Sequence, residues 1–116
     1  MNIEITKESD ALICLLYKKY SLARKDGATK EEAIAFGSSL DIFNNIAPKW
    51  NESDVDSACR ELGKAKLLDI PVFADDIAWQ VSLSDKGIVY MENRFKDGLN
   101  GLLDYLAKIK SIIPFL

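Results

Sequence analysis

Residues 51–68 read NESDVDSACRELGKAKLL, and this stretch decides the fold that we predict. Asn51 stands where an N-cap is needed, Asp54 follows three residues later, and Trp50 and Val55 are spaced to form a hydrophobic staple. Residues at i, i+3, i+4 and i+7 are apolar, which predicts a buried stripe of Val55, Ala58, Cys59 and Leu62. The outward face should then carry Asp54, Asp56, Ser57, Arg60, Glu61 and Lys64.

Residues 77–83, IAWQVSL, change from the helical period to a period of two, which is typical of a half-buried strand. The inward side chains should be Ile77, Trp79, Val81 and Leu83, and the outward ones Ala78, Gln80 and Ser82. We expect residues 67–73 to form the partner strand through the turn at residues 74–76, with Pro71 on the open edge because it cannot donate to a ladder. This predicts a two-stranded hairpin.

Upstream, apolar residues at helical spacing predict a first helix from about Ser9 to Leu22, with a stripe wide enough to pack on two sides. Thr29 and Glu32 form the pattern of a capping box and predict a second helix that continues to Phe36. Residues 37–39 weaken that helix, and residues 40–46 are expected to form a separate short helical segment before Pro48.

Downstream, Ser84 is placed to cap a fourth long helix, with Leu83 and Ile88 as staple partners. Residues 97–98, Asp-Gly, mark a break. A last helix over about residues 99–113 is predicted from a broad apolar stripe that consists of Leu102, Leu103, Leu106, Ile109, Ile112 and Ile113.

The composition is that of one globular domain spanning residues 1–116, since 48% of the 116 residues are apolar and 28% are charged. The predicted fold class is mainly α with a small antiparallel β-hairpin (α+β). No apolar run is long enough to suggest a membrane span and no basic leader is visible, so we expect a cytoplasmic protein without membrane contact.

The absence of histidine removes the commonest proton shuttle and metal ligand, so we expect no enzymatic activity and no cofactor. Cys14 and Cys59 fall in apolar helical stripes and are expected to be reduced, buried and unreactive. The sequence lacks the spacing of a calcium loop at its candidate ligands, which are Asp69, Asp75, Asp76 and Asp85, so no metal site is predicted. Asp75-Asp76 are assigned to a turn. Trp79 is expected to pack and not to stack on a base.

The order of helices and hairpin resembles the winged helix-turn-helix superfamily, particularly its small bacterial and phage-type members, over about residues 7–95. Two stretches carry the resemblance: residues 51–68, and Leu83-Ser84-Asp85-Lys86-Gly87, which is similar to the L-[ST]-x-x-G pattern after the wing. Lys66 stands where family members often have glycine at the end of the third helix. The resemblance implies a winged helix with an added C-terminal helix over about residues 99–113.

The resemblance also implies binding of double-stranded DNA by the third helix and the wing, as a transcriptional regulator. The DNA-binding residues we predict are Ser57, Arg60, Lys64 and Lys66. Residues 51–94 carry only five basic side chains, and the acidic ones include Glu52, Asp54, Asp56, Asp75 and Asp76. A protein-interaction module that presents this acidic surface to a basic protein is therefore the alternative, and Lys18, Lys19, Arg24 and Lys25 form a second candidate phosphate patch.

The predicted last helix is too apolar to lie alone in water. It should either dock back onto the first helix or pair with its copy in a homodimer, and the two arrangements are compatible. In a dimer, Phe115 and Leu116 would be buried.

Overall fold

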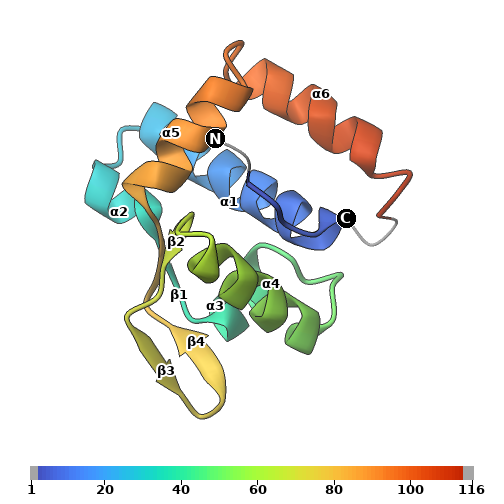
Figure 1. The fold of residues 1–116 in the computed structure, drawn as a ribbon. Helices are drawn as coiled ribbons and strands as arrows, with labels where there is room; N and C mark the ends of the chain where they lie inside the picture. Colours follow the sequence, from blue (N-terminus) through green and yellow to red (C-terminus); the bar gives the residue numbers. More distant parts are fainter. Residues whose placement is uncertain (1–2, 114–116) are drawn as a thin grey trace.

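A computed structural model describes residues 3–113, and the element that the others surround is α1, Lys7–Lys25 (Figure 1). The Thr6 hydroxyl accepts a hydrogen bond from the Ser9 amide and caps the helix start. Helices α4 and α6 pack against α1, which confirms the wide apolar stripe. The helix is longer at both ends than the 9–22 segment that was predicted, and Leu22 is left 40% exposed.

The second predicted helix is too long, because its last residues belong to a strand. Helix α2 covers only Lys30–Ile34, although the predicted Thr29–Glu32 capping box is present. Residues Ala35–Gly37 form β1, which buries Phe36. Ser38 then caps α3, Ser39–Asn45, with a second capping box to Asp41. The separate short helix was therefore predicted correctly, and the strand before it was missed because strand pairing is not local.

Helix α4, Glu52–Lys64, confirms the helix that was predicted from residues 51–68. The Asn51 carboxamide oxygen accepts a hydrogen bond from the Ser53 amide, so Asn51 is the N-cap. The buried residues are the four that the spacing predicted, Val55, Ala58, Cys59 and Leu62. They pack against α1 and the other residues of the core.

The predicted hairpin is divided into two small antiparallel sheets. Strands β3, Val72–Ala74, and β4, Ile77–Trp79, pair as a two-stranded hairpin. Strand β5, Val81–Leu83, lies between β1 and β2, Leu68–Asp69, in a three-stranded sheet of order β1-β5-β2. Gln80 has a φ of 53° and separates β4 from β5.

The break at Gln80 also changes which side chains face the core. Val81 and Leu83 are buried as predicted, but before the break Ala78 is the buried residue, and Ile77 and Trp79 are half-buried. The prediction that Ala78 faces outward is therefore wrong. A strand interrupted by one residue in the left-handed region loses its period of two, and the pattern of apolar letters does not reveal such an interruption.

The hairpin turn is made by Asp75 and Asp76, whose φ angles are 52° and 62°. Ala74 and Ile77 close the turn as a register pair. Positive φ at both central residues is the requirement of a type I′ turn, in which Asp is favoured. The assignment of Asp75-Asp76 to turn chemistry is confirmed.

Helix α5, Asp85–Arg94, begins as predicted, because the Ser84 hydroxyl accepts a hydrogen bond from the Gly87 amide. The same hydroxyl donates a hydrogen bond of 2.6 Å to the Lys66 carbonyl. A Cβ at Gly87 would lie 2.2 Å from the Leu67 carbonyl oxygen. The Leu-Ser-x-x-Gly stretch therefore joins the start of α5 to the end of α4, and glycine is required for this close approach.

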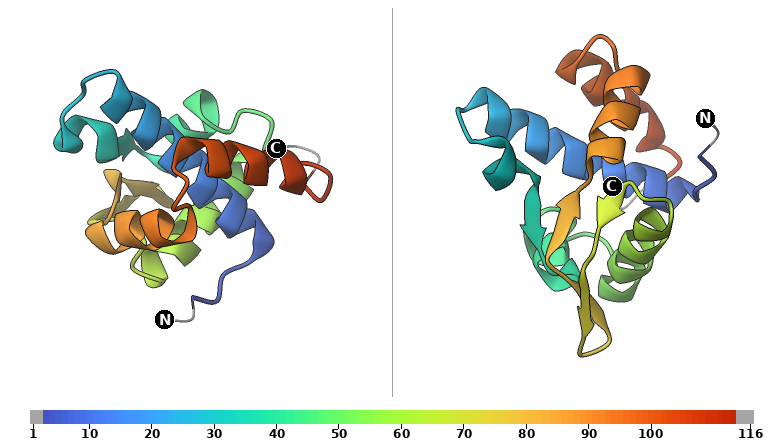
Figure 2. Two further views of the ribbon diagram at one scale, coloured as in Figure 1. Left: turned by 90° about the horizontal axis from the view of Figure 1, so that it is seen from above. Right: turned by 60° about the vertical axis from the view of Figure 1, so that its left-hand side comes forward.

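Helix α6, Leu99–Ile109, lies across α1 (Figure 2). Arg94 and the Tyr105 hydroxyl both donate to the Asp10 carboxylate, which links α5 and α6 to α1. The helix ends four residues earlier than the predicted residue 113, and Leu103 and Ile112 are exposed. The predicted burial of Phe115 and Leu116 falls outside the described residues.

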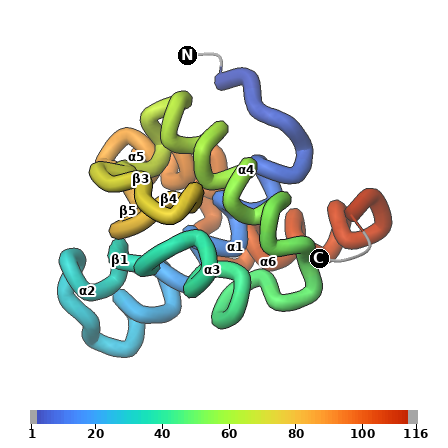
Figure 3. The backbone as a smooth tube through the Cα atoms, turned by 90° about the horizontal axis from the view of Figure 1, so that it is seen from below, coloured from blue at the N-terminus to red at the C-terminus, as the bar shows by residue number. Residues whose placement is uncertain are grey.

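Viewed from below, α3, α4 and the hairpin lie side by side on the face opposite α6 (Figure 3). The architecture is thus α+β, with α1 between the C-terminal helix on one side and α4 with the small sheets on the other. Among the described helices, none combines the length and the apolar character that a membrane crossing requires.

Candidate nucleic-acid interface

A groove of about 960 Å³ runs between the C-terminal half of α4 and the β2–β3 side of the hairpin. Three cations line it, Arg60, Lys64 and Lys66, together with a single carboxylate, Asp69. Leu68, Ile70, Pro71 and Phe73 supply its apolar wall, and Gly63, Gln80 and Ser82 complete the lining. The groove is therefore locally basic on a chain with a net charge of −3.

Three of the four predicted DNA-binding residues meet in this groove, and the fourth does not. Ser57 is exposed and lines a different depression of about 180 Å³, beside the N-terminal segment. Its neighbours there include the acidic residues Glu8, Asp54 and Glu61. The structure therefore does not bring Ser57 together with the three cations, because Ser57 lies beside Thr6 and the start of α1 and not beside the hairpin.

Arg60 is held in place by three interactions. Its Nε donates to Asp56 at 2.7 Å, and its Nη2 donates to the Asp76 carbonyl oxygen at 2.8 Å. The guanidinium carbon lies 4.8 Å from the centroid of the Phe73 ring, within cation–π range. Arg60 therefore braces the hairpin against α4, and part of its charge is balanced by Asp56.

Asp56 was predicted to point outward, but its side chain is only 14% exposed. Its carboxylate accepts hydrogen bonds from the Ser39 hydroxyl at 2.7 Å, the Ala78 amide at 2.9 Å and Arg60. Burial acts to raise the pKa of this carboxyl, but the three hydrogen bonds outweigh burial, so the pKa is lowered. Asp56 is thus a largely buried anion that joins α3, α4 and β4.

Lys66 adopts a φ of 67° immediately after α4. The Lys66 amide donates to the Gly63 carbonyl and the Leu67 amide donates to the Leu62 carbonyl, which is the pattern of a Schellman motif. The sequence showed Lys66 in place of a glycine, and the structure shows that it takes the left-handed conformation that glycine favours.

The side-chain ammonium groups of Lys64 and Lys66 form no hydrogen bond or ion pair with any other described residue. Both are exposed. Hydrogen bonds from Ser9 and Thr6 lower the pKa of Glu61, and the Lys64 charge adds a smaller contribution in the same direction. These two ammonium groups are therefore the cations of the groove with most capacity to contact a phosphate.

Phe73 is the residue of this site that sequence reasoning missed. It is 54% exposed and lines the groove. The aromatic considered beforehand, Trp79, donates its indole N–H to the Ala74 carbonyl at 2.7 Å and is used within the hairpin. No signal in the sequence distinguishes the two, because the register of the hairpin decides which aromatic faces α4.

The acidic residues that argued against DNA binding lie around the groove more than in it. Glu52 and Asp54 occupy the first turn of α4, where they favour the helix dipole, and both are exposed. Asp75 and Asp76 form the hairpin turn. Of the acidic side chains, only Asp69 is among the described residues that line the groove.

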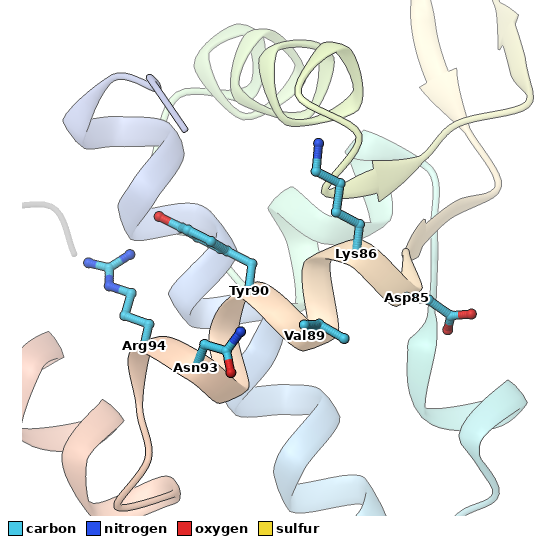
Figure 4. Close-up of a pocket in the computed structure, with 6 residues that line it drawn as sticks. All are labelled: Asp85, Lys86, Val89, Tyr90, Asn93 and Arg94. Carbon is cyan, nitrogen blue, oxygen red and sulfur yellow. The ribbon is translucent and has the colours of Figure 1, made fainter. Parts of the chain in front are cut away.

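A second depression, of about 620 Å³, follows one face of α5 (Figure 4). Its lining includes two cations that already have partners in the chain. Lys86 donates to the Ala65 carbonyl at 3.2 Å, and Arg94 is bound to Asp10. Val89, 53% exposed, supplies the apolar part. This face has fewer available charged groups than the groove beside α4.

The cysteine thiols offer no nucleophile. Cys14 and Cys59 are buried, and burial raises the pKa of each thiol to about 12, so both are neutral near pH 7. Within residues 3–113, no three metal-ligating side chains gather.

Comparison of the chain with models of protein families, with curated proteins and with solved structures gives no significant match.

Proposed function

We propose that this chain is a small winged-helix regulator that binds double-stranded DNA weakly, through the groove between α4 and the hairpin. Three features support the fold assignment. The chain order is α1, α2, β1, α3, α4 and then strands β2 to β5. Strand β1 joins the base of the hairpin through β5, and α3 packs against α4. In a winged helix, α4 would be the recognition helix and the β3–β4 hairpin the wing.

The observation that carries the proposed activity is the convergence of Arg60, Lys64 and Lys66 on one groove with little opposing charge. Each neutralised phosphate adds about 0.9 to the slope of log affinity against log salt. Three cations predict three phosphate contacts and a slope of about −3. Strong specific binders make about six to ten such contacts. Binding should therefore be detectable at low salt and largely lost at physiological salt.

The test is fluorescence anisotropy with a labelled duplex near 50 mM salt, followed by a salt titration. Lys64→Ala and Lys66→Ala should each reduce the salt slope by about one. Lys108→Ala, an exposed lysine on α6, is the matched control and should leave the slope unchanged. Undetectable binding at the lowest salt would reject DNA as the ligand, and unchanged slopes in both groove variants would move the site to Lys18, Lys19, Arg24 and Lys25.

A second candidate function is a protein-binding module, and the depression beside Ser57 favours it. Glu8, Asp54 and Glu61 line that depression, and none of its described lining residues is a cation. A basic peptide would complement it. Titration with a labelled arginine-rich peptide checks this candidate: binding should weaken on Asp54→Asn, and binding that is indifferent to Asp54 would count against the depression.

We also propose that α6 contributes to a homodimer. Its buried side, Leu102 and Leu106, packs on α1, while Leu103 on the same helix is 39% exposed. Ile112, three residues after the helix ends, is 59% exposed. Static light scattering at micromolar concentration should report a dimer that becomes monomeric in Leu103→Glu. A monomeric parent protein would contradict the proposal.

A further inference from the structure

Phe73 is a large aromatic side chain that the fold leaves more than half exposed, at 54%. It is not isolated on the surface, because it lines the same groove as Lys64 and Lys66. An exposed aromatic ring beside cations is the combination that binds unpaired nucleotides, since the ring stacks on a base and the cations attract the backbone.

The Phe73 ring is held in a defined orientation before any ligand binds. Arg60 lies over it at 4.8 Å from the centroid, and Arg60 is itself fixed by Asp56 and by the Asp76 carbonyl. A ring braced on one side loses little freedom when a base stacks against its exposed surface, so the entropic cost of binding is low.

The charge of the groove suits a short unpaired segment better than a long duplex. With Arg60 partly neutralised by Asp56, Lys64 and Lys66 are the cations without an ion pair among the described residues. Two ammonium groups suffice for a few nucleotides when stacking supplies the remaining affinity. Gln80, exposed in the same groove, adds an amide that can donate to and accept from a base edge.

We infer that the groove contains a base-stacking subsite: an unpaired base stacks on Phe73 while Lys64 and Lys66 contact the flanking phosphates. This inference rests on the proposed nucleic-acid binding and specifies its ligand as DNA with unpaired bases next to a duplex. The duplex would contact the groove as proposed above, and the unpaired base at its end would reach Phe73.

The experiment compares a blunt duplex with the same duplex carrying a short single-stranded thymidine tail, by anisotropy near 50 mM salt. The tailed probe should bind at least about 5-fold more tightly, as one stacked base predicts. Phe73→Ala and Phe73→Leu should both abolish this preference, which is measured as the ratio of the affinities for the two probes. Phe73→Leu keeps an apolar contact for Arg60, so it separates loss of stacking from loss of the brace.

Val72→Ala is the matched control, because Val72 is also exposed but alternation places its side chain on the other face of β3. It should keep the preference for the tailed probe. Equal affinity for the two probes, or a preference that survives in Phe73→Ala, would overturn the stacking subsite and leave the proposed duplex binding intact. Absence of binding to either probe would overturn both proposals.

Discussion

The backbone amide of Ala78 donates a hydrogen bond of 2.9 Å to the side chain of Asp56, and this bond attaches the hairpin to α4. Ala78 is completely buried, so its amide has no water to replace a lost partner. The same carboxylate accepts hydrogen bonds from the Arg60 guanidinium, which it orients, and from the Ser39 hydroxyl. One largely buried anion thus fixes the geometry of both walls of the candidate groove.

Asp56→Asn should lower the free energy of unfolding by about 2 kcal/mol, because hydrogen bonds to a charged acceptor contribute about 1.5–3 kcal/mol. Urea denaturation is the measurement. Asp75→Asn is the matched control, since Asp75 is exposed and asparagine tolerates its positive φ, so stability should change little. Equal losses in the two variants would argue against a special role for Asp56.

Lys66→Gly should stabilise the protein by about 1 kcal/mol, because a residue other than glycine is disfavoured at the φ of 67° that Lys66 adopts. Lys66→Ala keeps the backbone strain and should show no such gain. Both variants remove the ammonium group and should weaken DNA binding equally. A thermal melt combined with the anisotropy assay therefore separates the conformational effect of Lys66 from its charge, and equal stability of the two variants would contradict the strain argument.

Gly87→Ala should destabilise the protein by about 3 kcal/mol, because the new Cβ would lie 2.2 Å from the Leu67 carbonyl oxygen and backbone must move. Gly101→Ala is the contrasting substitution. Gly101 lies inside α6, and a Cβ there would meet no atom closer than 3.5 Å. The substitution should therefore raise the free energy of unfolding by about 0.5–1 kcal/mol. Chemical denaturation of both variants tests the pair, and a tolerated Gly87→Ala would show that the α4–α5 junction can separate.

Acid should destabilise the protein through Asp10 and Asp56. Burial acts to raise the pKa of the Asp10 carboxyl, but hydrogen bonds from Arg94 and Tyr105 outweigh it, and the pKa is lowered, as for Asp56. Because the folded pKa values lie below the unfolded value of about 4, the stabilisation is complete above pH 4 and is lost as pH falls through the folded values.

Unfolding free energies measured from neutral pH downward should be level to about pH 4 and should decline below it. Asp10→Asn should be less stable at neutral pH and should show a shallower acid decline. An Asp10→Asn profile as steep as that of the parent protein would exclude Asp10 as a source of the pH dependence.

The starts of α2, α4 and α5 were predictable because capping is a local matter of a few residues. The start of α1 was not, since the helix begins at Lys7 with Thr6 as its cap and not at Ser9. The side chains of Thr29, Asn51 and Ser84 each accept a hydrogen bond from a backbone amide in the first turn of the helix, as expected of an N-cap. The buried stripe of α4 followed from spacing for the same reason. The cations Arg60, Lys64 and Lys66 were also identified from the sequence, although their roles differ: Arg60 braces the hairpin, while the two lysines remain available.

The sequence by itself determined the starts of α2, α4 and α5, the α4 stripe, the acidic turn of the hairpin and the lack of histidine chemistry. All of these depend on composition or on neighbours a few residues away. Only the tertiary structure decided that residues 35–37 pair as a strand, that Gln80 turns Ala78 inward, and that Phe73 lies beside Arg60. Those features depend on pairing between segments distant in the chain, where the packing energy of the whole domain outweighs local preference.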